Sequence, residues 1–319
     1  CDEVELYIIK STVIIAGTCT GFVSNRIIRD VEFDYVIVDE AAKATFPELA
    51  VSLNKAHKII LVGDHQQLPP VLDTEIIRNN KEKLDEEGLA QGIFERMYNM
   101  FPENNKHRLT IQYRMHPTIG TLISHVFYND EIQNGVEAQD RELCIEGYEG
   151  IAIEWISTSK YSTKERYEKE FENNGKKSYQ NYLERNIIER KLLELDSKLV
   201  KKTKVAVITG YGSQKYILQT MVKQHSFKHI EVDVDTVDAF QGSQKDIILY
   251  STVRSSGNKY GIGFLKSEAR INVAFSRARC LLIIVGDMKF LDNYKIRGNK
   301  FPEIIKYITE SEGCRIIEK

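Results

Sequence analysis

The stretch that decides the fold is YVIVDEAA, residues 35–42. Its first four residues are β-branched or aromatic, which predicts a buried parallel strand. Asp39 and Glu40 follow directly, and two adjacent carboxylates at a strand end suit Mg²⁺ binding and the activation of a water molecule. A second apolar run, Lys58–Val62, ends in GDHQQLPP, residues 63–70. Two strands that both deliver polar residues at their carboxyl ends indicate a nucleotide-binding α/β sheet.

Composition places the chain among soluble globular proteins. Its 319 residues are 42% hydrophobic and 28% charged, which leaves room for two domains with large cores. The net charge of −2 argues weakly against a passive nucleic-acid coat, yet it is compatible with a basic channel on a neutral body. The longest apolar runs are far too short to span a bilayer, so we expect no membrane association.

The cysteines and the first residue indicate the compartment of the protein and its relation to a longer polypeptide. The five cysteines lie far apart, their number is odd and no C-x-x-C occurs, which predicts reduced thiols. We therefore expect a cytoplasmic protein, or a nuclear one in a eukaryote. The chain begins with Cys1 instead of Met, and from this we expect it to be a piece of a longer polypeptide.

Strands and helices alternate along the first part of the chain, for which we expect a domain at residues 1–105. The predicted strands are Thr12–Ala16, Tyr35–Val38 and Lys58–Val62. Helices are predicted from Ala44 or Pro47 to Asn54 and, amphipathic, over Leu89–Met100, with a surface loop or frayed helix at Asp73–Gly88.

A second α/β domain is expected at residues 106–319. Its predicted strands are Ile151–Trp155, Lys204–Ile208, Val232–Thr236, Ile247–Ser251 and Leu281–Val285, and its predicted helices are Pro117–Phe127, Tyr179–Leu199, Ser213–Gln224 and Ser267–Ala278. The segment Lys160–Lys177 is rich in Lys, Glu and Asn, which predicts a mobile solvated insertion and leaves a nucleic-acid-facing role open.

Two motifs in the first half of the chain carry polar side chains suited to a phosphate site. The Gln67 amide is placed to orient a water or touch a phosphate, and Pro69-Pro70 stiffens its loop; a plain proline-ended turn is the alternative. In QYRMHP, residues 112–117, Arg114 precedes a helix that starts at Pro117 and is placed to reach outward; an ordinary interdomain salt bridge is the alternative. His116 is expected to hydrogen-bond at that helix start.

Two further motifs lie near the end of the second half. In DTVDAFQGSQKD, residues 235–246, Gly242 allows a close backbone approach to an anion. The alternative is a surface turn that carries polar side chains. In ARINVAFSRAR, residues 269–279, helical spacing puts Ile271 and Ala274 on a packed stripe, so Arg270 and Arg277 are expected to point elsewhere. Arginine suits bidentate phosphate contact, although a solvated face is the alternative.

The order of these motifs resembles that of superfamily 1 helicases, and most closely the branch that contains the nonsense-mediated-decay RNA helicase and senataxin. The resemblance covers essentially the whole chain: residues 36–42 look like motif II, 61–70 like motif III, 109–117 like the motif IV region, 234–246 like motif V and 261–287 like motif VI and its flanks. It implies an α/β protein with two RecA-like domains of parallel sheets flanked by helices, the first truncated at its N-terminus, that use ATP and Mg²⁺.

The resemblance also implies roles for individual residues. Asp39 would hold Mg²⁺, Glu40 would polarise the attacking water and Gln67 would sense the γ-phosphate. Arg114 and Arg277 would be arginine fingers. The remaining implied contacts are Gly242 and Gln244 near the γ-phosphate or ribose, and Thr18, Thr209, Tyr211 and Thr236 on the nucleic acid.

One expected motif does not occur in these 319 residues, the phosphate loop G-x-x-x-x-G-K-[ST]. We therefore expect this chain to be the C-terminal portion of a helicase or translocase, acting as a monomer on single-stranded RNA or DNA in the 5′ to 3′ direction, and inactive without the rest of the parent polypeptide. The alternative is a non-catalytic nucleic-acid-binding module that never had a phosphate loop. A third possibility is a parent with an attached nuclease.

Overall fold

The computed structural model describes residues 2–28, 31–70, 92–173, 176–256 and 261–318. The chain divides into two compact units, Cys1–His107 and Arg108–Lys319, and each is described by itself. The segment Asp73–Gly88, predicted as a loop or frayed helix, lies outside the described residues, as do residues 89–91 of the next predicted helix.

Unit 1 is built on two parallel strands, β1 (Phe33–Val38) and β2 (Ala56–Leu61), in which Val36 lies opposite Ile59 and Val38 opposite Leu61. Its other elements are α1 (Asp2–Ser11), α2 (Cys19–Ser24), η2 (Ala41–Lys43), α3 (Phe46–Leu53), α6 (Ile93–Met100) and η3 (Glu103–Asn105). The predicted strands at 35–38 and 58–62 and the helices ending near Asn54 and Met100 therefore have counterparts in the structure.

One face of the two strands forms the core of unit 1. Val38, Leu49 and Phe94 pack together there, bringing β1, α3 and α6 into contact. Helix α3 begins in a capping box, in which Thr45 and Glu48 hydrogen-bond reciprocally and Pro47 occupies the first turn. The core thus fixes the end of β1, directly before Asp39.

The predicted strand Thr12–Ala16 is wrong. These residues form no regular structure, and the side chains of Val13 and Ile14 are 98% and 82% exposed. A β-branched run carries only a preference for a pleated, half-buried surface, and it becomes a strand only when a neighbouring strand pairs with it. Within the described part of unit 1 the only paired strands are β1 and β2.

Unit 2 contains a six-stranded parallel sheet in the order β12-β5-β11-β10-β8-β9. These strands are β5 (Ile153–Ser157), β8 (Thr203–Thr209), β9 (Ile230–Thr236), β10 (Lys245–Ser251), β11 (Ala278–Gly286) and β12 (Cys314–Glu318). The helices and short elements around it are β3 (Ile111–Gln112), α7 (Pro117–Phe127), β4 (Gln133–Asn134), η4 (Ala138–Arg141), α9 (Tyr182–Lys198), α10 (Gly212–Val222), η5 (Gly263–Lys266), α11 (Glu268–Phe275), α12 (Met288–Asn293) and α13 (Phe301–Glu310).

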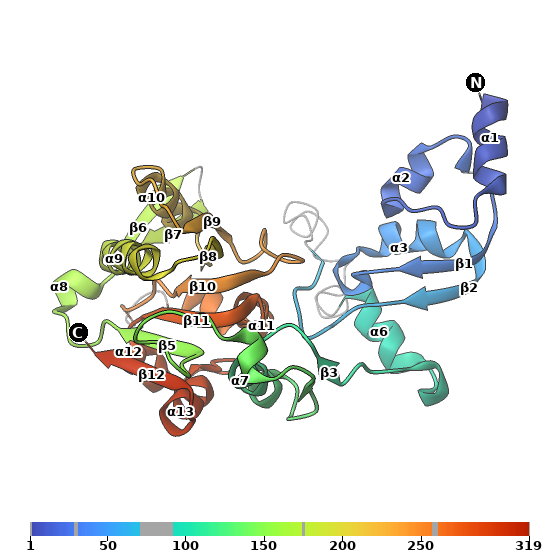
Figure 1. The fold of residues 1–319 in the computed structure, drawn as a ribbon. Coiled ribbons are helices and arrows are strands. Elements are labelled where there is room, and N and C mark those ends of the chain that lie inside the picture. The colour runs from blue at the N-terminus through green and yellow to red at the C-terminus, as the bar shows by residue number, and fades with distance from the viewer. Residues whose placement is uncertain (1, 29–30, 71–91, 174–175, 257–260, 319) are drawn as a thin grey trace. The chain divides into compact units, whose positions relative to one another are not determined.

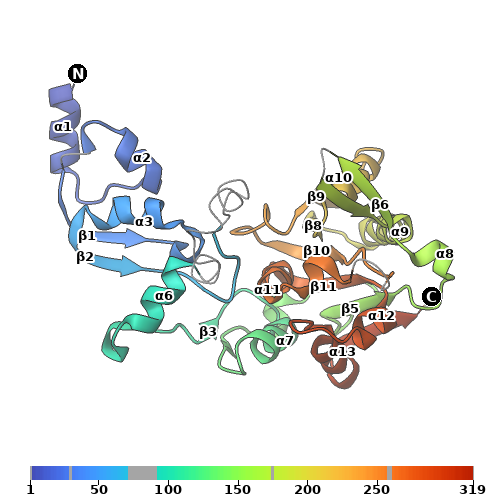
Figure 2. The same cartoon turned by 180° about the vertical axis from the view of Figure 1, so that it is seen from behind.

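Helices cover both faces of this sheet. Helices α9 and α10 lie on one face, and α7, α11 and α13 on the other, as both views show (Figures 1 and 2). The inner strands β8, β10 and β11 contain nearly continuous runs of buried apolar residues, as expected of a parallel sheet covered on both faces. Trp155 of β5 packs edge-on against Phe301 of α13. The predicted α/β class, with a parallel sheet flanked by helices, is confirmed.

The segment Lys160–Lys177, predicted to be a mobile solvated insertion, is largely exposed over its described residues but contains regular secondary structure. They form α8 (Thr163–Arg166) and the antiparallel hairpin of β6 (Lys169–Asn173) and β7 (Lys176–Gln180). The hairpin is anchored by Glu168, whose side chain is 2% exposed and lies 3.2 Å from the Arg254 guanidinium. Composition predicted the exposure of the segment, but it did not reveal that Glu168 has a buried arginine as partner.

Across the described residues, no helix has both the length and the apolar character needed to cross a bilayer.

Candidate nucleotide and nucleic-acid sites

Asp39 and Glu40 both lie exposed at the carboxyl end of β1. The Asp39 Oδ1 atom accepts a hydrogen bond of 2.9 Å from the Glu40 N–H. Glu40 itself has φ 54° and ψ 32°, in the left-handed region that residues other than glycine rarely adopt. Such backbone strain is concentrated at functional sites, where the surrounding structure maintains it.

Gln67 is oriented by Asp64 in the turn after β2. The Gln67 Nε2 atom donates to Asp64 Oδ2 at 2.8 Å, while Asp64 Oδ1 accepts from the Gln66 N–H at 2.9 Å. One carboxylate therefore shapes the turn and holds the amide that the sequence singles out.

The two strand ends approach each other closely. The Ala41 N–H donates to the Val62 carbonyl at 2.8 Å, so β1 and β2 stay paired up to the acidic residues. A Cβ atom on Gly63 would lie 2.8 Å from the Ala42 nitrogen, which means that only glycine fits there. The structure thus brings the acidic pair and the turn of Gln67 to one edge of the sheet.

The donor set at this edge fits a magnesium ion that is also held by phosphate oxygens and water. Among the described residues, no group of three or more His, Cys, Asp and Glu side chains is arranged to hold a metal by itself. Mg²⁺ is commonly bound through only one or two carboxylates together with substrate phosphates. The exposed Asp39 carboxylate meets that requirement.

In unit 2, Arg277 lies between α11 and the start of β11 and is 2% exposed. Its guanidinium donates to the Val273 carbonyl at 3.1 Å, the Ser243 carbonyl at 3.4 Å and the Ser276 hydroxyl at 3.1 Å. The expectation that Arg277 points away from the packed stripe is therefore corrected. Helix α11 ends at Phe275, so helical spacing no longer applies to Arg277.

Arg114 reaches the same place from a distant part of the sequence. Its Nη1 atom lies 3.5 Å from the carbonyl oxygen of Ser276, the residue before Arg277. Two residues later, the His116 N–H donates to the Arg279 carbonyl at 2.7 Å, which ties this segment to the start of β11. The Arg114 guanidinium thus lies beside the peptide group that precedes Arg277, at the amino end of β11.

The turn that contains Gly242 leads to the same edge. Gly242 has φ 82° and Gln244 is exposed, and both precede β10. The Lys245 N–H donates to the Arg277 carbonyl at 3.1 Å, which joins the two segments. The structure therefore brings the segments of Arg114, Gly242 and Arg277 together at this edge.

His116 caps helix α7, as expected. Its Nδ1 atom accepts from the Thr118 N–H at 3.2 Å. Burial lowers the pKa of His116, against the opposing effect of the nearby Glu142 carboxylate. The imidazole is thereby kept neutral, the form that can accept this hydrogen bond.

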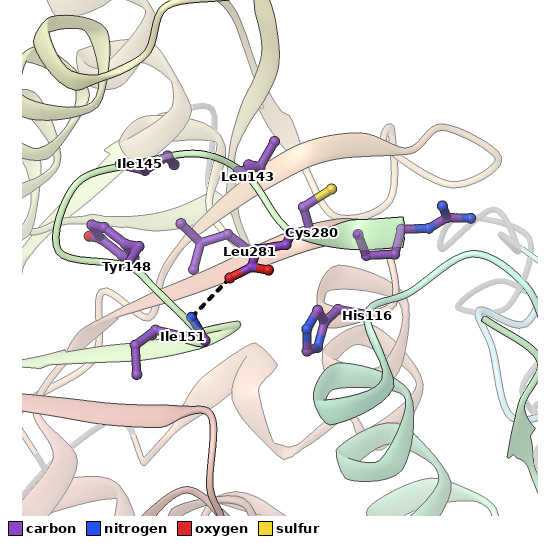
Figure 3. A pocket seen from close by; sticks show the side chains of 10 residues that line it. His116, Leu143, Ile145, Tyr148, Ile151, Cys280 and Leu281 are labelled. Carbon is purple, nitrogen blue, oxygen red and sulfur yellow. Dashed lines mark hydrogen bonds between the residues drawn. The ribbon is translucent and has the colours of Figure 1, made fainter. Parts of the chain in front are cut away.

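A small pocket lies beside this cap, lined in part by His116, Tyr148 and Cys280 (Figure 3). Burial raises the pKa of the Cys280 thiol to about 11, so the sulfur is protonated and a weak nucleophile. Arg114 and Arg277 are not among its lining residues. The pocket is therefore separate from the site of Arg114 and Arg277.

The residues predicted to contact nucleic acid differ in how exposed their side chains are. Thr209 and Thr236 lie opposite each other at the carboxyl ends of β8 and β9, and the exposed Thr18 caps α2 through its hydroxyl. Tyr211 is only 3% exposed, and its ring packs edge-on against Tyr179 and Phe264. The side chain of Thr209 is also buried. In this conformation Tyr211 and Thr209 could meet a ligand only through their backbone.

Two side chains that the sequence analysis did not single out hold the backbone around Arg114. They are Gln112 and Arg141, which hydrogen-bond to main-chain groups of residues 113–115. Their residue types alone carried no signal for this role, because an arginine on a short surface element is usually solvated.

Comparison with known proteins adds family evidence. Residues 89–289 match a family described as an AAA domain, and residues 2–75 match a second family of the same description. The chain belongs to the AAA domain family. The first of these matches covers more than half of the chain and includes Arg114, Gly242 and Arg277.

Several curated proteins resemble the chain. It is 34% identical over 311 residues to the Regulator of nonsense transcripts 1 homolog of Neurospora crassa, which covers 92% of the chain and 26% of that protein. It is 35% identical over 324 residues to the ATP-dependent helicase NAM7 of Saccharomyces cerevisiae, which covers 98% of the chain and 31% of that protein. The chain thus spans about a quarter to a third of the length of these relatives.

Among solved structures, the chain is similar to the PRRSV helicase, with 17% identity and a TM-score of 0.37. The match covers 79% of this chain and 34% of that one. It is similar to the arterivirus nonstructural protein 10 helicase solved with DNA, with 14% identity and a TM-score of 0.38.

Proposed function

We propose that this chain is the C-terminal portion of an ATP-dependent helicase or translocase that moves along single-stranded RNA or DNA in the 5′ to 3′ direction. The observation that carries the proposal is the convergence of Asp39, Glu40 and the turn of Gln67 at one sheet edge. The similarity to curated ATP-dependent helicases supports it. We further propose that the protein works as a monomer in the cytoplasm, or in the nucleus of a eukaryote.

At the acidic edge, Asp39 would hold a magnesium ion, which supplies charge neutralisation for the nucleotide phosphates. Glu40 would accept a proton from the attacking water, and its left-handed backbone fixes where that carboxylate points. The Gln67 amide, held by Asp64, would orient the same water or respond to the γ-phosphate. Preorganised groups of this kind need no rearrangement when charge develops in the transition state.

In unit 2, Arg114 and Arg277 would stabilise the negative charge that develops on the transferring phosphoryl group. Gly242 and Gln244 would contribute contacts to the γ-phosphate or the ribose. Arginine is suited to this task because its planar fork stays charged and binds phosphate oxygens in pairs.

Nucleic acid would bind along the carboxyl ends of β8 and β9, where Thr209 and Thr236 lie side by side. Thr18 of unit 1 and the backbone around Tyr211 complete the proposed contacts. Such contacts address the sugar–phosphate backbone, and they are therefore compatible with single strands of any sequence.

The test is ATP hydrolysis by the full-length protein with and without single-stranded nucleic acid. Glu40→Gln should lower the stimulated kcat by about 10²–10⁴-fold, the usual contribution of a general base, while nucleotide binding is retained. Asp34→Asn is the matched control, because Asp34 is an exposed carboxylate near the other end of the same strand.

Equal kcat values for the wild type and Glu40→Gln would refute the catalytic assignment. Full-length protein that binds single strands but hydrolyses no ATP would favour the alternative function, a non-catalytic binding module. Parallel unwinding assays on matched RNA and DNA substrates, with either a 5′ or a 3′ overhang, would then decide substrate and direction.

A further inference from the structure

The segment that carries Arg114 is held by two side chains from opposite sides. On one side, Gln112 Oε1 accepts from the Arg114 N–H at 2.9 Å and from the Met115 N–H at 2.8 Å, and its Nε2 atom donates to the Met115 carbonyl at 3.0 Å. A single glutamine amide therefore satisfies three main-chain groups around the arginine.

On the other side, Arg141 binds the carbonyl groups of the same segment. Its Nη2 atom donates to the Tyr113 carbonyl at 2.7 Å and its Nε atom to the Arg114 carbonyl at 2.8 Å. Its Nη1 atom donates to the Asp140 carbonyl at 3.0 Å. All three guanidinium nitrogens are thus committed, which fixes the plane of the fork against two successive peptide groups.

Arg141 is itself well supported. It ends η4, a short helix closed by a capping box between Glu137 and Asp140. Gln112 is likewise held in place, since its Nε2 atom donates to Asn134 Oδ1 at 2.8 Å. Gln112 and Arg141 are therefore anchored on separate elements. A lysine at position 141 could not reproduce the planar guanidinium group.

We propose that Arg141 is a positioning residue that fixes the Tyr113–Arg114 backbone, so that the Arg114 guanidinium is presented beside Ser276 and Arg277. The inference rests on the proposed role of Arg114 in ATP hydrolysis. Arg141 acts through the peptide groups and has no contact of its own with the nucleotide. Its loss would let the arginine shift, and a displacement of about 1 Å of a catalytic group can cost about 10²-fold in rate.

A double-mutant cycle on the full-length protein tests this. Arg141→Ala should lower kcat of the nucleic-acid-stimulated ATPase by about 10²-fold, with little change in nucleotide affinity. In an Arg114→Ala background, the same change should alter kcat by less than about twofold, because the group that Arg141 positions is already absent. Arg141→Lys should recover part of the rate.

The matched control is Arg190→Ala, which removes an arginine from α9 that donates to one main-chain carbonyl at 3.4 Å. It should leave kcat unchanged in both backgrounds. Amide hydrogen exchange adds a readout that is independent of activity: exchange at Arg114 and Met115 should rise in Arg141→Ala. Should that variant fail to fold, Arg141→Lys enters the cycle in its place.

The outcomes separate this inference from the proposed function. A normal kcat in Arg141→Ala, or an equal fold-loss with and without Arg114, would overturn the positioning role while leaving the proposed function intact. If Arg114→Ala itself left kcat unchanged, both the assignment of Arg114 and the role of Arg141 would be overturned.

Discussion

Arg277 is a charged residue that is buried and held by several hydrogen bonds. Among its contacts, the guanidinium donates to two main-chain carbonyls and to a serine hydroxyl. Burial and these contacts together fix the position of the guanidinium in the folded protein.

Arg277→Ala should lower kcat for ATP hydrolysis by about 10³-fold, the range measured for arginine fingers, with nucleotide binding less affected. The physical reason is that charge develops on the phosphoryl group mainly in the transition state. Steady-state kinetics combined with equilibrium nucleotide titration on the full-length protein separates the two effects.

Arg277→Lys is the informative companion variant, because it keeps the charge and removes the fork. The kcat of this variant should remain far below that of the wild type. Thermal unfolding of both variants controls for the lost contacts to Ser243 and Val273. Parallel losses of binding and rate would contradict the assignment.

For single residues, the sequence predicted which side chains have suitable chemistry better than it predicted how buried those side chains are. The chemistry of Asp39, Glu40, Gln67 and Arg114 could be argued from residue type and from position after a strand or before a helix. The burial of Arg277 and Tyr211 could not, because it depends on where α11 ends and on aromatic neighbours brought in from β7 and η5. The role of Arg141 depends on a long-range contact that no local pattern contains.

Among the elements, the β6–β7 hairpin is joined to the rest of unit 2 by Glu168. Besides its ion pair with Arg254, this carboxylate accepts from the Ser255 and Ser256 N–H groups, each at 2.9 Å. Arg254 is fully buried and stacks over the Tyr179 ring at 4.1 Å. One acidic side chain therefore orders the segment that follows β10 as well as the hairpin.

Glu168→Ala should destabilise unit 2 by about 3–5 kcal/mol, because it leaves the Arg254 charge buried without its carboxylate. Urea unfolding monitored by circular dichroism measures the change. Glu172→Ala is the control, since Glu172 is an exposed carboxylate on the same hairpin, and surface changes of this kind stay within about 0.5 kcal/mol. Similar free energies of unfolding for the two variants would refute the anchoring role.

Elements were predictable where hydrophobic periodicity was strong and where pairing partners are present. Strands β8, β10 and β11 were found because each is a continuous apolar run covered on both faces. Thr12–Ala16 has a similar composition but pairs with no described strand. The hairpin was missed because its Lys and Glu content conceals the alternation that marks a strand.

At the level of the whole molecule, unit 2 buries the carboxylates of Glu154 and Glu184 completely, and Glu184 lies on helix α9. Glu184 of α9 accepts hydrogen bonds from Ser251, Thr252 and the Val253 N–H, which connects the helix to the end of β10. Burial raises the pKa of Glu184 from 4.5 to about 8, against the opposing effect of those hydrogen bonds. The side chain is therefore protonated in the folded protein at neutral pH.

This shift predicts a pH dependence of stability. Because the pKa of Glu184 is higher in the folded state than in the unfolded one, its contribution is fully present below about pH 4.5 and is lost as the pH rises through about 8. Glu184→Gln, a permanently neutral replacement, should flatten the pH dependence of the unfolding free energy between pH 5 and about pH 9. Urea titrations of both proteins at pH 5, 7 and 9 measure it, and identical slopes would contradict the assignment.

The α/β class of the molecule was predictable because it depends only on the alternation of apolar runs and helical segments. The order of the strands was not, since the sequence does not state which runs are neighbours. The same limitation applies to the candidate site in unit 2, where the Arg114 and Arg277 segments lie far apart in sequence and meet only after the sheet forms.

The strand order has a consequence for biosynthesis. Among the described strands, β5 pairs with β11 and β12 alone, and both are translated much later. On the ribosome, the nascent chain must therefore carry an apolar strand with two unsatisfied edges until the last strands emerge. Non-local parallel pairing of this kind is slow and favours aggregation. We accordingly expect assistance by chaperones to matter more for this polypeptide than for one whose strands assemble in the order of synthesis.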